Sequence, residues 1–423
     1  MNNREEIQVG IGFATGRANF QQVLKTNVYN WQECGLTERE KVRLNLLVAY
    51  DLEYSNTKQT DYTNVSGDVL GLVDDTYFIG NAAIEKEIRF LAREGIVTPA
   101  EARTLFVGGY ASKRNILLYT AMKNKMDCLL FLDDDEYPVA VTKTHSTAIW
   151  SGQHVLNTHL KNIRRADITN GYHCGYISPI PYIGFNDRLS ESDFRLFIEA
   201  ISNDIVSWDT IRSVMDSGGV TYADTDVLVN DSPQVVPEIN RAKFISGSNL
   251  CVNLKNPERV LPFYNPPGAR GEDTFLGTCL HDRTVLRVPC YTFHDGFSMY
   301  HHLMDGVLPI ELKHIQANSK KIVSRFYRAC VGWVRYKPLL LYITQRDEYE
   351  RQIARMRDQL TLTLPKLCAY FNRNEFMNLM PELELYHKNV RKHYREFLET
   401  QRIWTKLTDS LFCDSREADR KAQ

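Results

Sequence analysis

The sequence has no long apolar run, no C-x-x-C pair and almost no net charge. No stretch approaches the ~18 apolar residues needed to span a bilayer, so we expect no membrane-spanning helix. The nine cysteines are scattered, which is typical of buried thiols in a reducing compartment. Residues 1–20 hold no basic leader followed by an apolar segment, so we expect no secretory signal. These absences predict a cytoplasmic protein, at most peripheral to the inner face of a membrane.

The formal net charge of −1 gives no indication of a nucleic-acid partner, and we expect none. The charge is nevertheless unevenly distributed. Residues 311–423 hold 22 Lys and Arg against 14 Asp and Glu, whereas the rest of the chain holds 29 against 38. A basic segment on an acidic body is typical of contact with an anionic partner or a membrane surface. Apolar stretches such as residues 338–343 fit packing against the rest of the chain equally well.

Strand and helix patterns alternate through the first third of the chain. Strands are expected where short apolar runs are bounded by turn residues, at 7–14, 42–50, 104–107 and 128–132. Helices are expected at 19–35, 81–94 and 110–125. Ser112 is the expected N-cap of the third helix. This alternation predicts an α/β fold with a mostly parallel sheet flanked by helices.

The pattern is less regular after residue 139. Residues 155–163 fit a helix or a strand, and the remaining expected elements are a helix at 191–215, an interrupted strand at 243–254, a helix starting near Glu272 and a strand at 284–293. Appended helices are expected at 311–330, 345–360, 366–379 and 384–408, separated near Pro338, Pro365 and Pro381. We therefore expect a catalytic domain at 1–309, with halves at 1–138 and 139–309, and a basic helical region at 310–423.

The most informative stretch is MDCLLFLDDDEYP, residues 126–138. An apolar run predicts a strand buried on both faces, and Pro138 is expected to end its pairing. The run stops at three aspartates and a glutamate, at the sheet edge where open α/β sheets bind ligands. If the segment stays extended, Asp133 and Asp135 project to one side. That spacing suits one Mg²⁺ or Mn²⁺ ion, with a diphosphate completing its shell. The alternative is a solvated acidic turn.

Basic and polar residues are expected at the same edge. Lys113, Arg114 and Asn115 lie near the start of a helix, where free N–H groups and a partial positive charge favour phosphate. The alternative is an ordinary basic first turn. The turn at 15–17 follows the first strand and Asp51 ends the second. Asp51 can accept a hydrogen bond from a base or a ribose hydroxyl, or can simply cap a turn.

Two further groups follow later in the chain. Glu272 and Asp273 open a helix after Gly271, a suitable position for a general base, although acids also stabilise helix N-termini. His294 ends a strand and can complete a metal shell begun by Asp135, or it can be a hydrogen-bonded structural histidine. We expect His301 and His302 to be ordinary polar residues.

Taken in chain order, these segments resemble a GT-A fold glycosyltransferase of the large family two, over roughly residues 5–300. Its most specific part runs from Arg114-Asn115 to the D-x-D motif at Asp133–Asp135. The resemblance implies a Rossmann-like sheet in which Asp51 binds the base, usually uracil. Departures from the family pattern are the long link at 52–103 and the insertion at 150–240.

The resemblance also implies individual roles. Asp273 is the expected catalytic base, with Glu272 beside it. The expected metal ligands are Asp133, Asp135 and His294. The residues expected to bind the nucleotide-sugar are Thr15, Arg17, Asp51, Lys113, Arg114, Asn115, Asp133, Asp134, Gly247 and Asn249.

These roles predict a metal-dependent glycosyltransferase of the hexosyltransferase type, active in glycan or polysaccharide synthesis. The expected donor is a UDP-sugar, with a GDP-sugar as the alternative. The expected acceptor is a hydroxyl of a carbohydrate or lipid-linked molecule, and the expected outcome is inversion with Mn²⁺ or Mg²⁺ as cofactor.

Three alternative functions follow from the same sequence. A sugar-phosphate nucleotidylyltransferase generally has a Gly-rich, Arg-containing opening loop followed by Lys, which TGRANF does not supply. A dinucleotide oxidoreductase is disfavoured because Gly10 and Gly12 fall inside a strand and Asp51 lies too far along. The third is a non-enzymatic protein that binds a polyanion or membrane through the basic C-terminal helices.

Overall fold

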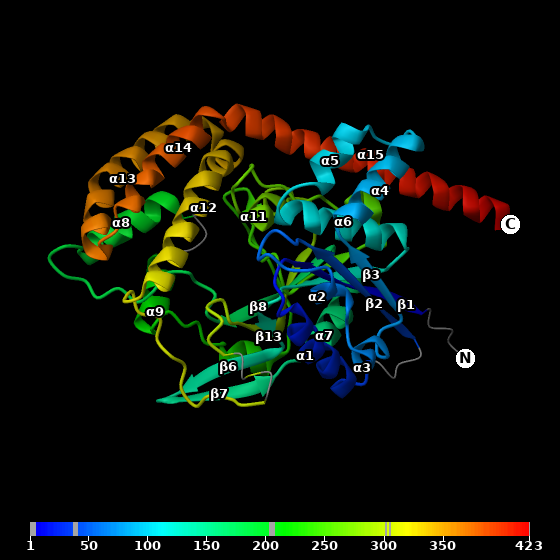
Figure 1. Cartoon of the computed structure of the whole chain (residues 1–423), viewed down its shortest axis with the longest axis horizontal. Coiled ribbons are helices and arrows are strands. Elements are labelled where there is room, and N and C mark those ends of the chain that lie inside the picture. The colour runs from blue at the N-terminus through cyan, green and yellow to red at the C-terminus, as the bar shows by residue number, and fades with distance from the viewer. Residues whose placement is uncertain (1–5, 37–40, 203–207, 301–302, 304–305, 423) are drawn as a thin grey trace.

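A computed structural model describes residues 6–36, 41–202, 208–300, 303 and 306–422, and only the backbone of 412–422. Within this part the chain forms a large mixed sheet flanked by helices, with a helical C-terminal region beside it (Figure 1). The strands of the main sheet are β1 Ile7–Thr15, β2 Val42–Tyr50, β3 Asp75–Ile79, β4 Cys128–Leu132, β5 Glu136–Tyr137, β8 Ile168–Gly175, β9 Gln234–Val235, β12 Leu250–Asn253 and β13 Val285–His294. Smaller pairs are formed by β6 Val139–Thr144 with β7 Thr147–Gly152 and by β10 Glu238–Ile239 with β11 Ala242–Lys243.

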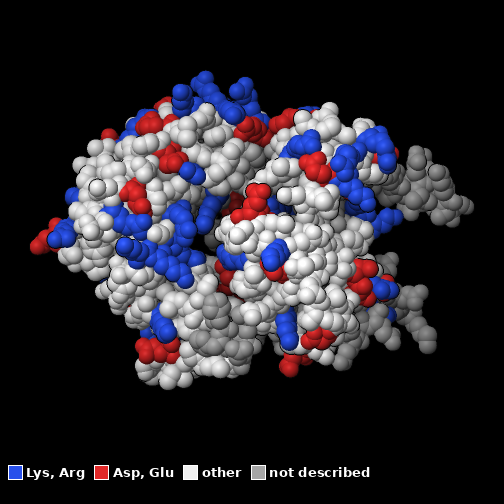
Figure 2. Space-filling view, in the orientation of Figure 1, with Lys and Arg blue, Asp and Glu red and all other residues white. Residues whose placement is uncertain are grey.

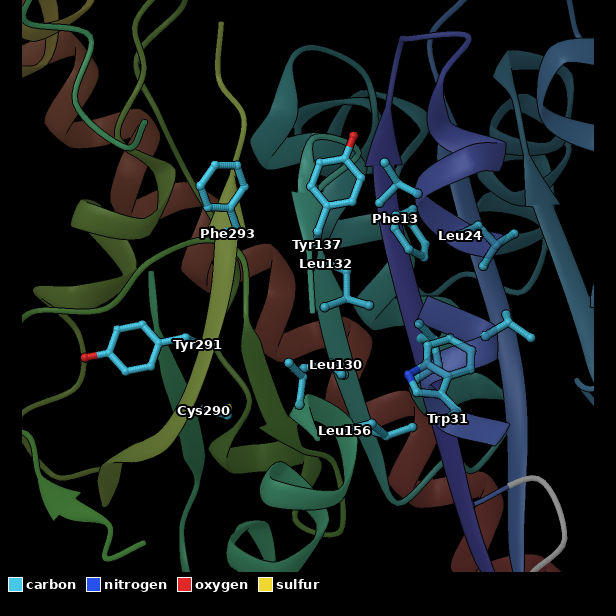
Figure 3. Packing of buried hydrophobic residues seen from close by; sticks show 14 of the residues in the cluster. Phe13, Leu24, Trp31, Leu130, Leu132, Tyr137, Leu156, Cys290, Tyr291 and Phe293 are labelled. Carbon is cyan, nitrogen blue, oxygen red and sulfur yellow. The ribbon is translucent and has the colours of Figure 1, made fainter. Parts of the chain in front are cut away.

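The N-terminal half of the sheet is parallel, in the order β3-β2-β1-β4. It is buried on both faces because alternate residues of each strand meet different helices. Leu130 and Leu132 of β4 lie on the side of α1 (Phe20–Glu33), with Phe13 of β1 and Trp31 of α1 (Figure 3). Phe131 faces the other way, toward the cluster that includes residues of α4 (Asn81–Arg93) and α6 (Tyr110–Lys123). Burial on both faces explains why the apolar runs of these strands are uninterrupted. Apart from the segment at 104–107, the strands and helices expected in this half are confirmed.

The prediction of a mostly parallel sheet is wrong for the second half. β12 is antiparallel to both of its neighbours, β4 and β8, while β13 is parallel to β8 and antiparallel to β5 and β9. Residue pattern does not encode strand direction. β8 ends at the edge of the sheet where β12 begins, because residues 176–249 bring the chain back to that edge, and β12 therefore runs in the opposite direction.

The expected strand at 104–107 is also wrong, because these residues belong to α5 (Pro99–Phe106) or immediately follow it. Thr98 caps this helix: its hydroxyl accepts from the backbone N–H of Glu101, whose carboxylate accepts from the N–H of Thr98. This capping box, with Pro99 at the first helical position, begins a helix firmly. Ser112 is not an N-cap, since α6 begins at Tyr110 after Gly109.

Several shorter helices connect the sheet strands. They are α2 Thr60–Thr63, α3 Gly67–Leu70, α7 Val155–Asn162, α8 Glu191–Ile201, α9 Trp208–Asp216, α10 Thr225–Asn230 and α11 Glu272–Gly277. The expected helix at 191–215 corresponds to α8 and α9, and residues 203–207 between them lie outside the described part. The ambiguous segment 155–163 is mainly helical, and the helix expected near Glu272 is confirmed as α11.

The C-terminal region consists of α12 (Lys320–Thr344), α13 (Tyr349–Phe371), α14 (Leu379–Lys388) and α15 (Val390–Ala422). The expected start at 311 is wrong, as is the expected separation at prolines, because Pro338 and Pro365 lie inside α12 and α13. Pro381 falls in the first turn of α14, where its missing N–H removes no helical bond. Burial of the apolar residues around Pro338 compensates for the bond lost in α12.

These helices pack on the rest of the chain. α12, α13 and α14 share one apolar cluster with α8, which comes from the insertion, and α15 crosses over α5 (Figure 1). The indole N–H of Trp404 in α15 donates to the carbonyl of Val260 at 2.8 Å. The apolar stretch at 338–343 is mostly buried in this cluster. No helix in the described ranges is long and apolar enough to cross a membrane.

Candidate active site

Three adjacent parallel strands deliver the predicted site residues to one edge of the sheet. β1 ends at Thr15, β2 is followed by Asp51, and β4 is followed by Asp133–Asp135. The chain runs from β1 outward through β2 and β3, and then returns to place β4 on the other side of β1. Such a reversal of strand order opens a crevice at the carboxyl ends of the strands, where ligands bind in open α/β sheets.

Asp134 and Asp135 are held by the loop after β1. The Thr15 hydroxyl donates to Asp134 Oδ2 at 2.5 Å, and Arg17 Nη1 lies 2.7 Å from Asp134 Oδ1 and 2.5 Å from Asp135 Oδ2. Asn19 donates to the carbonyl of Asp134 at 3.2 Å. Burial raises the pKa of Asp134, and Arg17 opposes that increase. The loop after β1 therefore neutralises part of the acidic run within the protein itself.

The acidic run does not stay extended, because Asp134 and Asp135 form a turn between β4 and β5. Asp133 and Asp135 consequently have different partners rather than projecting to one side as a pair. Asp133 Oδ1 lies 3.2 Å from Arg114 Nη2. Strand β5 ends directly before Pro138 and strand β6 begins directly after it. The expectation that Pro138 ends regular pairing is therefore wrong. The structure thus distributes the four acids among separate partners, which reduces their mutual repulsion.

His294 lies beside Asp135 because β5 pairs with β13, with Glu136 opposite His294. The imidazole Nε2 lies 3.4 Å from Asp135 Oδ1. Burial lowers the pKa of His294, but the Asp135 carboxylate outweighs it and raises this pKa to about 9. The separation is close to the ~3 Å expected between adjacent ligands of one octahedral ion. Mg²⁺ often takes only one or two protein carboxylates besides phosphates and water, so Asp135 suits such an ion, and His294 would join it only as the neutral imidazole.

The third expected metal ligand does not join this pair, since Asp133 is turned toward Arg114. Within the described ranges, no three His, Cys, Asp or Glu side chains are grouped so as to hold a metal ion. A metal at Asp135 and His294 would therefore rely on substrate oxygens. The residues His301 and His302 lie outside the described part of the chain.

Asp51 and Lys113 come together from β2 and α6. Asp51 Oδ2 lies 3.0 Å from Lys113 Nζ, and Asp51 Oδ1 accepts from the backbone N–H of Glu53 at 3.0 Å. Both side chains retain some solvent access. Tyr54, which the sequence analysis did not single out, lies in the same loop with 54% of its surface exposed. A Cβ on Gly16 would stand 2.6 Å from the Cβ of Tyr54, so the two loops are in close contact.

Arg114 links the two acidic groups of the site. It is 2% exposed and lies between the rings of Phe131 and Phe263, 5.2 and 5.6 Å from their centroids. Its guanidinium donates to the carbonyl of Gly247, pairs with Asp133 and lies 3.5 Å from Glu272 Oε1. At that distance Nε has no hydrogen bond. Arg114 is thus a buried cation between the acidic run and the acid pair.

Asp273 is positioned by backbone groups. Its Oδ2 accepts from the N–H of Gly247 at 3.2 Å and its Oδ1 from the N–H of Thr274 at 2.7 Å. Gly271 precedes the helix with φ of 92°, a left-handed conformation that favours glycine. Burial, aided by the neighbouring Glu272 charge, raises the pKa of Asp273 to about 6. An acid with this pKa can accept a proton near neutral pH.

Two predicted residues serve the framework. Asn115 bonds the carbonyl and N–H of Phe263 and the carbonyl of Leu105. Asn249 is fully buried and bonds His159 Nε2 at 2.8 Å and the carbonyl of Tyr172 at 3.0 Å. Their direct binding of a nucleotide-sugar stays a prediction that these contacts do not support.

The structure shows the partners of Glu136, the last acid of the run, and it adds Arg325, which sequence reasoning missed. Glu136 is 4% exposed and accepts from the hydroxyls of Ser248 and Thr292 at 2.6 and 2.8 Å. It thereby ties β5 to the Gly247 loop. Arg325 comes from α12 and stacks on Phe297 at 4.4 Å. No sequence signal separates Arg325 from the other basic residues of its helix, because its position depends on how α12 packs.

Comparison with known proteins does not identify the chain. No protein-family model matches it, and no curated protein matches it significantly. The class of protein must therefore be argued from the residues of the site.

Proposed function

We propose that this protein is a glycosyltransferase that moves a sugar from a nucleotide diphosphate sugar to an acceptor hydroxyl. The observation that carries the proposal is the meeting of three groups at one sheet edge. These are the Asp51–Lys113 pair, the acidic run with Arg17 and His294, and Asp273 with its raised pKa. A base-binding acid, a diphosphate site and a general base are the parts that such a transfer needs, and we assign them to a site of the GT-A type.

The nucleotide is assigned to the loops after β1 and β2. Asp51 accepts a hydrogen bond from the base, and the exposed ring of Tyr54 offers a surface on which the base can stack. Lys113 and Arg17 lie on the path toward Asp135 and supply positive charge for the phosphates. A UDP-sugar is favoured, because the glycosyltransferase family that the sequence resembles usually binds uracil through such an acid.

Asp135 and His294 are assigned as the protein ligands of Mg²⁺ or Mn²⁺. The ion, when bound, stabilises the negative charge of the leaving diphosphate as a Lewis acid. Arg17 contacts both Asp134 and Asp135 and holds the two carboxylates in place.

Asp273 is assigned as the general base. The acceptor oxygen forms a bond to the anomeric carbon as the bond from that carbon to the diphosphate oxygen breaks. The hydroxyl proton passes to Asp273, and the electron pair of the broken bond stays on the diphosphate. The N–H groups of Gly247 and Thr274 hold the carboxylate still. A single displacement of this kind inverts the anomeric centre.

The test measures thermal stabilisation by UDP, GDP, CDP and dTDP, each with and without Mn²⁺. A ligand that binds only the folded state raises the melting temperature. We expect UDP to stabilise the protein in the presence of Mn²⁺, and Asp135→Ala to remove the dependence on metal. Asp51→Ala should reduce the stabilisation by UDP. Asp187→Ala, in an exposed loop, should change neither the stabilisation by UDP nor its dependence on metal. If no nucleotide raises the melting temperature in the presence of metal, the proposal is wrong.

A further inference from the structure

A cavity is lined in part by the turn that precedes the candidate base Asp273. It has a volume of about 310 Å³ and lies between the turn at 268–270 and one face of α12, with Glu382 of α14 also lining it. Its lining includes Arg270, Arg328 and Arg335. Arg270 lies three residues before Asp273 in the chain, so their Cα atoms are at most about 11 Å apart. The lining of the cavity therefore begins close to the candidate base, to which the acceptor hydroxyl is assigned.

The cavity holds more positive charge than its own acids neutralise. Arg335 is matched by Glu382, with nitrogen–oxygen distances of 2.8 and 2.7 Å. Among the described residues, no carboxylate forms an ion pair with Arg270 or Arg328. The stem of Arg270 lies against α12, with its Cδ 3.2 Å from where a Cβ on Gly332 would stand. Gly332 is one turn after Arg328, so the two unneutralised arginines flank the same part of the cavity.

Arg325 connects this cavity to the candidate metal site. It lies three residues before Arg328, on the same face of α12, and a Cβ on Gly296 would collide with its guanidinium. Burial lowers its pKa to about 10; Asp135 opposes this decrease, while Arg17, Arg270 and Arg328 add to it. Figure 2 shows Lys and Arg gathered where Figure 1 places α12, beside the hollow in this face.

We propose that this cavity binds a phosphate group carried by the acceptor. This inference rests on the proposed glycosyltransferase function and adds the substrate class of its acceptor. Two guanidinium groups can bind a phosphate dianion through several charge-assisted hydrogen bonds. The volume suits a phosphate ester with part of its sugar or alkyl chain, since ligand pockets begin near 300 Å³. Binding there places a neighbouring hydroxyl of the acceptor toward Asp273.

The test titrates the full-length protein with glucose 6-phosphate by calorimetry, with glucose and glucuronate in parallel. The test variant is Arg270→Gln/Arg328→Gln. The matched control is Lys320→Gln/Lys321→Gln, which removes two exposed charges from α12 outside the cavity. We expect glucose 6-phosphate to bind the wild type and the control equally, and the test variant at least tenfold more weakly. Arg270→Lys/Arg328→Lys should retain part of the affinity, which separates lost charge from lost folding.

Several outcomes would overturn the inference: no binding of glucose 6-phosphate to the wild type, an equal loss in the control, or equal binding of glucuronate. Octyl phosphate distinguishes two sources of the ligand, since tighter binding of the alkyl ester indicates a lipid-linked acceptor and tighter binding of the sugar ester a soluble one.

The thermal stabilisation by UDP with Mn²⁺ is measured on the same variants. We expect Arg270→Gln/Arg328→Gln to retain it. If the variant loses UDP binding as well, the cavity holds the donor diphosphate and the acceptor assignment is wrong. If the wild type binds glucose 6-phosphate but no nucleotide, the glycosyltransferase proposal fails while the phosphate site remains.

Discussion

Replacing Arg114 with methionine tests whether the buried cation holds the two acidic groups in place. Methionine keeps an apolar stem between Phe131 and Phe263 but leaves Asp133 and Glu272 without their partner. Removing one member of a buried ion pair costs about 3–5 kcal/mol. Because the Asp133 side chain is 29% exposed, we expect a loss at the lower end, about 3 kcal/mol of unfolding free energy.

Urea unfolding, followed by tryptophan fluorescence, measures this loss. The matched control is Arg103→Met, whose partner Glu85 is exposed, and which should cost under about 1 kcal/mol. The double variant Arg114→Met/Asp133→Asn should recover about 1 kcal/mol or more, because it no longer buries an unpaired carboxylate. Equal stability of the single and double variants, or equal losses in Arg114→Met and Arg103→Met, would refute this reasoning.

Further predictions concern catalysis, pH and packing. Asp273→Asn should lower the rate of UDP release from UDP-hexoses by about 10²–10⁴-fold, and the exposed Asp282→Asn serves as the control. In the wild type this rate should rise with pH through about 6 as Asp273 ionises. The same pH dependence of the rate in Asp273→Asn would contradict the assignment. Burial lowers the pKa of His159 to about 4, below its unfolded value of about 6.5. The contribution of the neutral His159 to the free energy of unfolding should therefore be fully present above pH 6.5 and fall by roughly 3 kcal/mol toward pH 4. In urea titrations, His159→Gln should reduce this dependence of stability on pH. Trp404→Ala should cost about 3–5 kcal/mol through lost packing of α15, whereas Leu398→Ala, 44% exposed, should cost little; similar thermal shifts in both would show that α15 is not docked as described.

Local patterns predicted the elements that are buried in a regular way. β2 was expected at the residues it occupies, and α4 was placed to within one residue, because apolar residues at a constant spacing face one partner along the whole element. The capping box at Thr98 and Glu101 was also present in the sequence, and applying it would have identified α5. The prolines within α12 and α13 misled the prediction, since packing of whole helices outweighs the loss of a single backbone bond.

The candidate site was predictable as a set of residues but not as a set of contacts. That acids follow β4 and that Asp51 follows β2 can be read along the chain. That Arg17 neutralises Asp134 and Asp135 while Arg114 takes Asp133 cannot, because each pair joins residues more than fifteen positions apart. The turn after β4 also depended on β5 finding β13 as its partner.

The sequence by itself determined the short-range features: the buried strands, the capping box that begins α5 and the acids placed at strand ends. These depend on spacing and on the backbone preferences of neighbouring residues. Only the tertiary structure decided the direction of β12, the pairing of Asp135 with His294 and the approach of Arg325 from α12. These features depend on how distant segments pack, because each draws its free energy from burial and charge pairing between residues that chain order does not bring together.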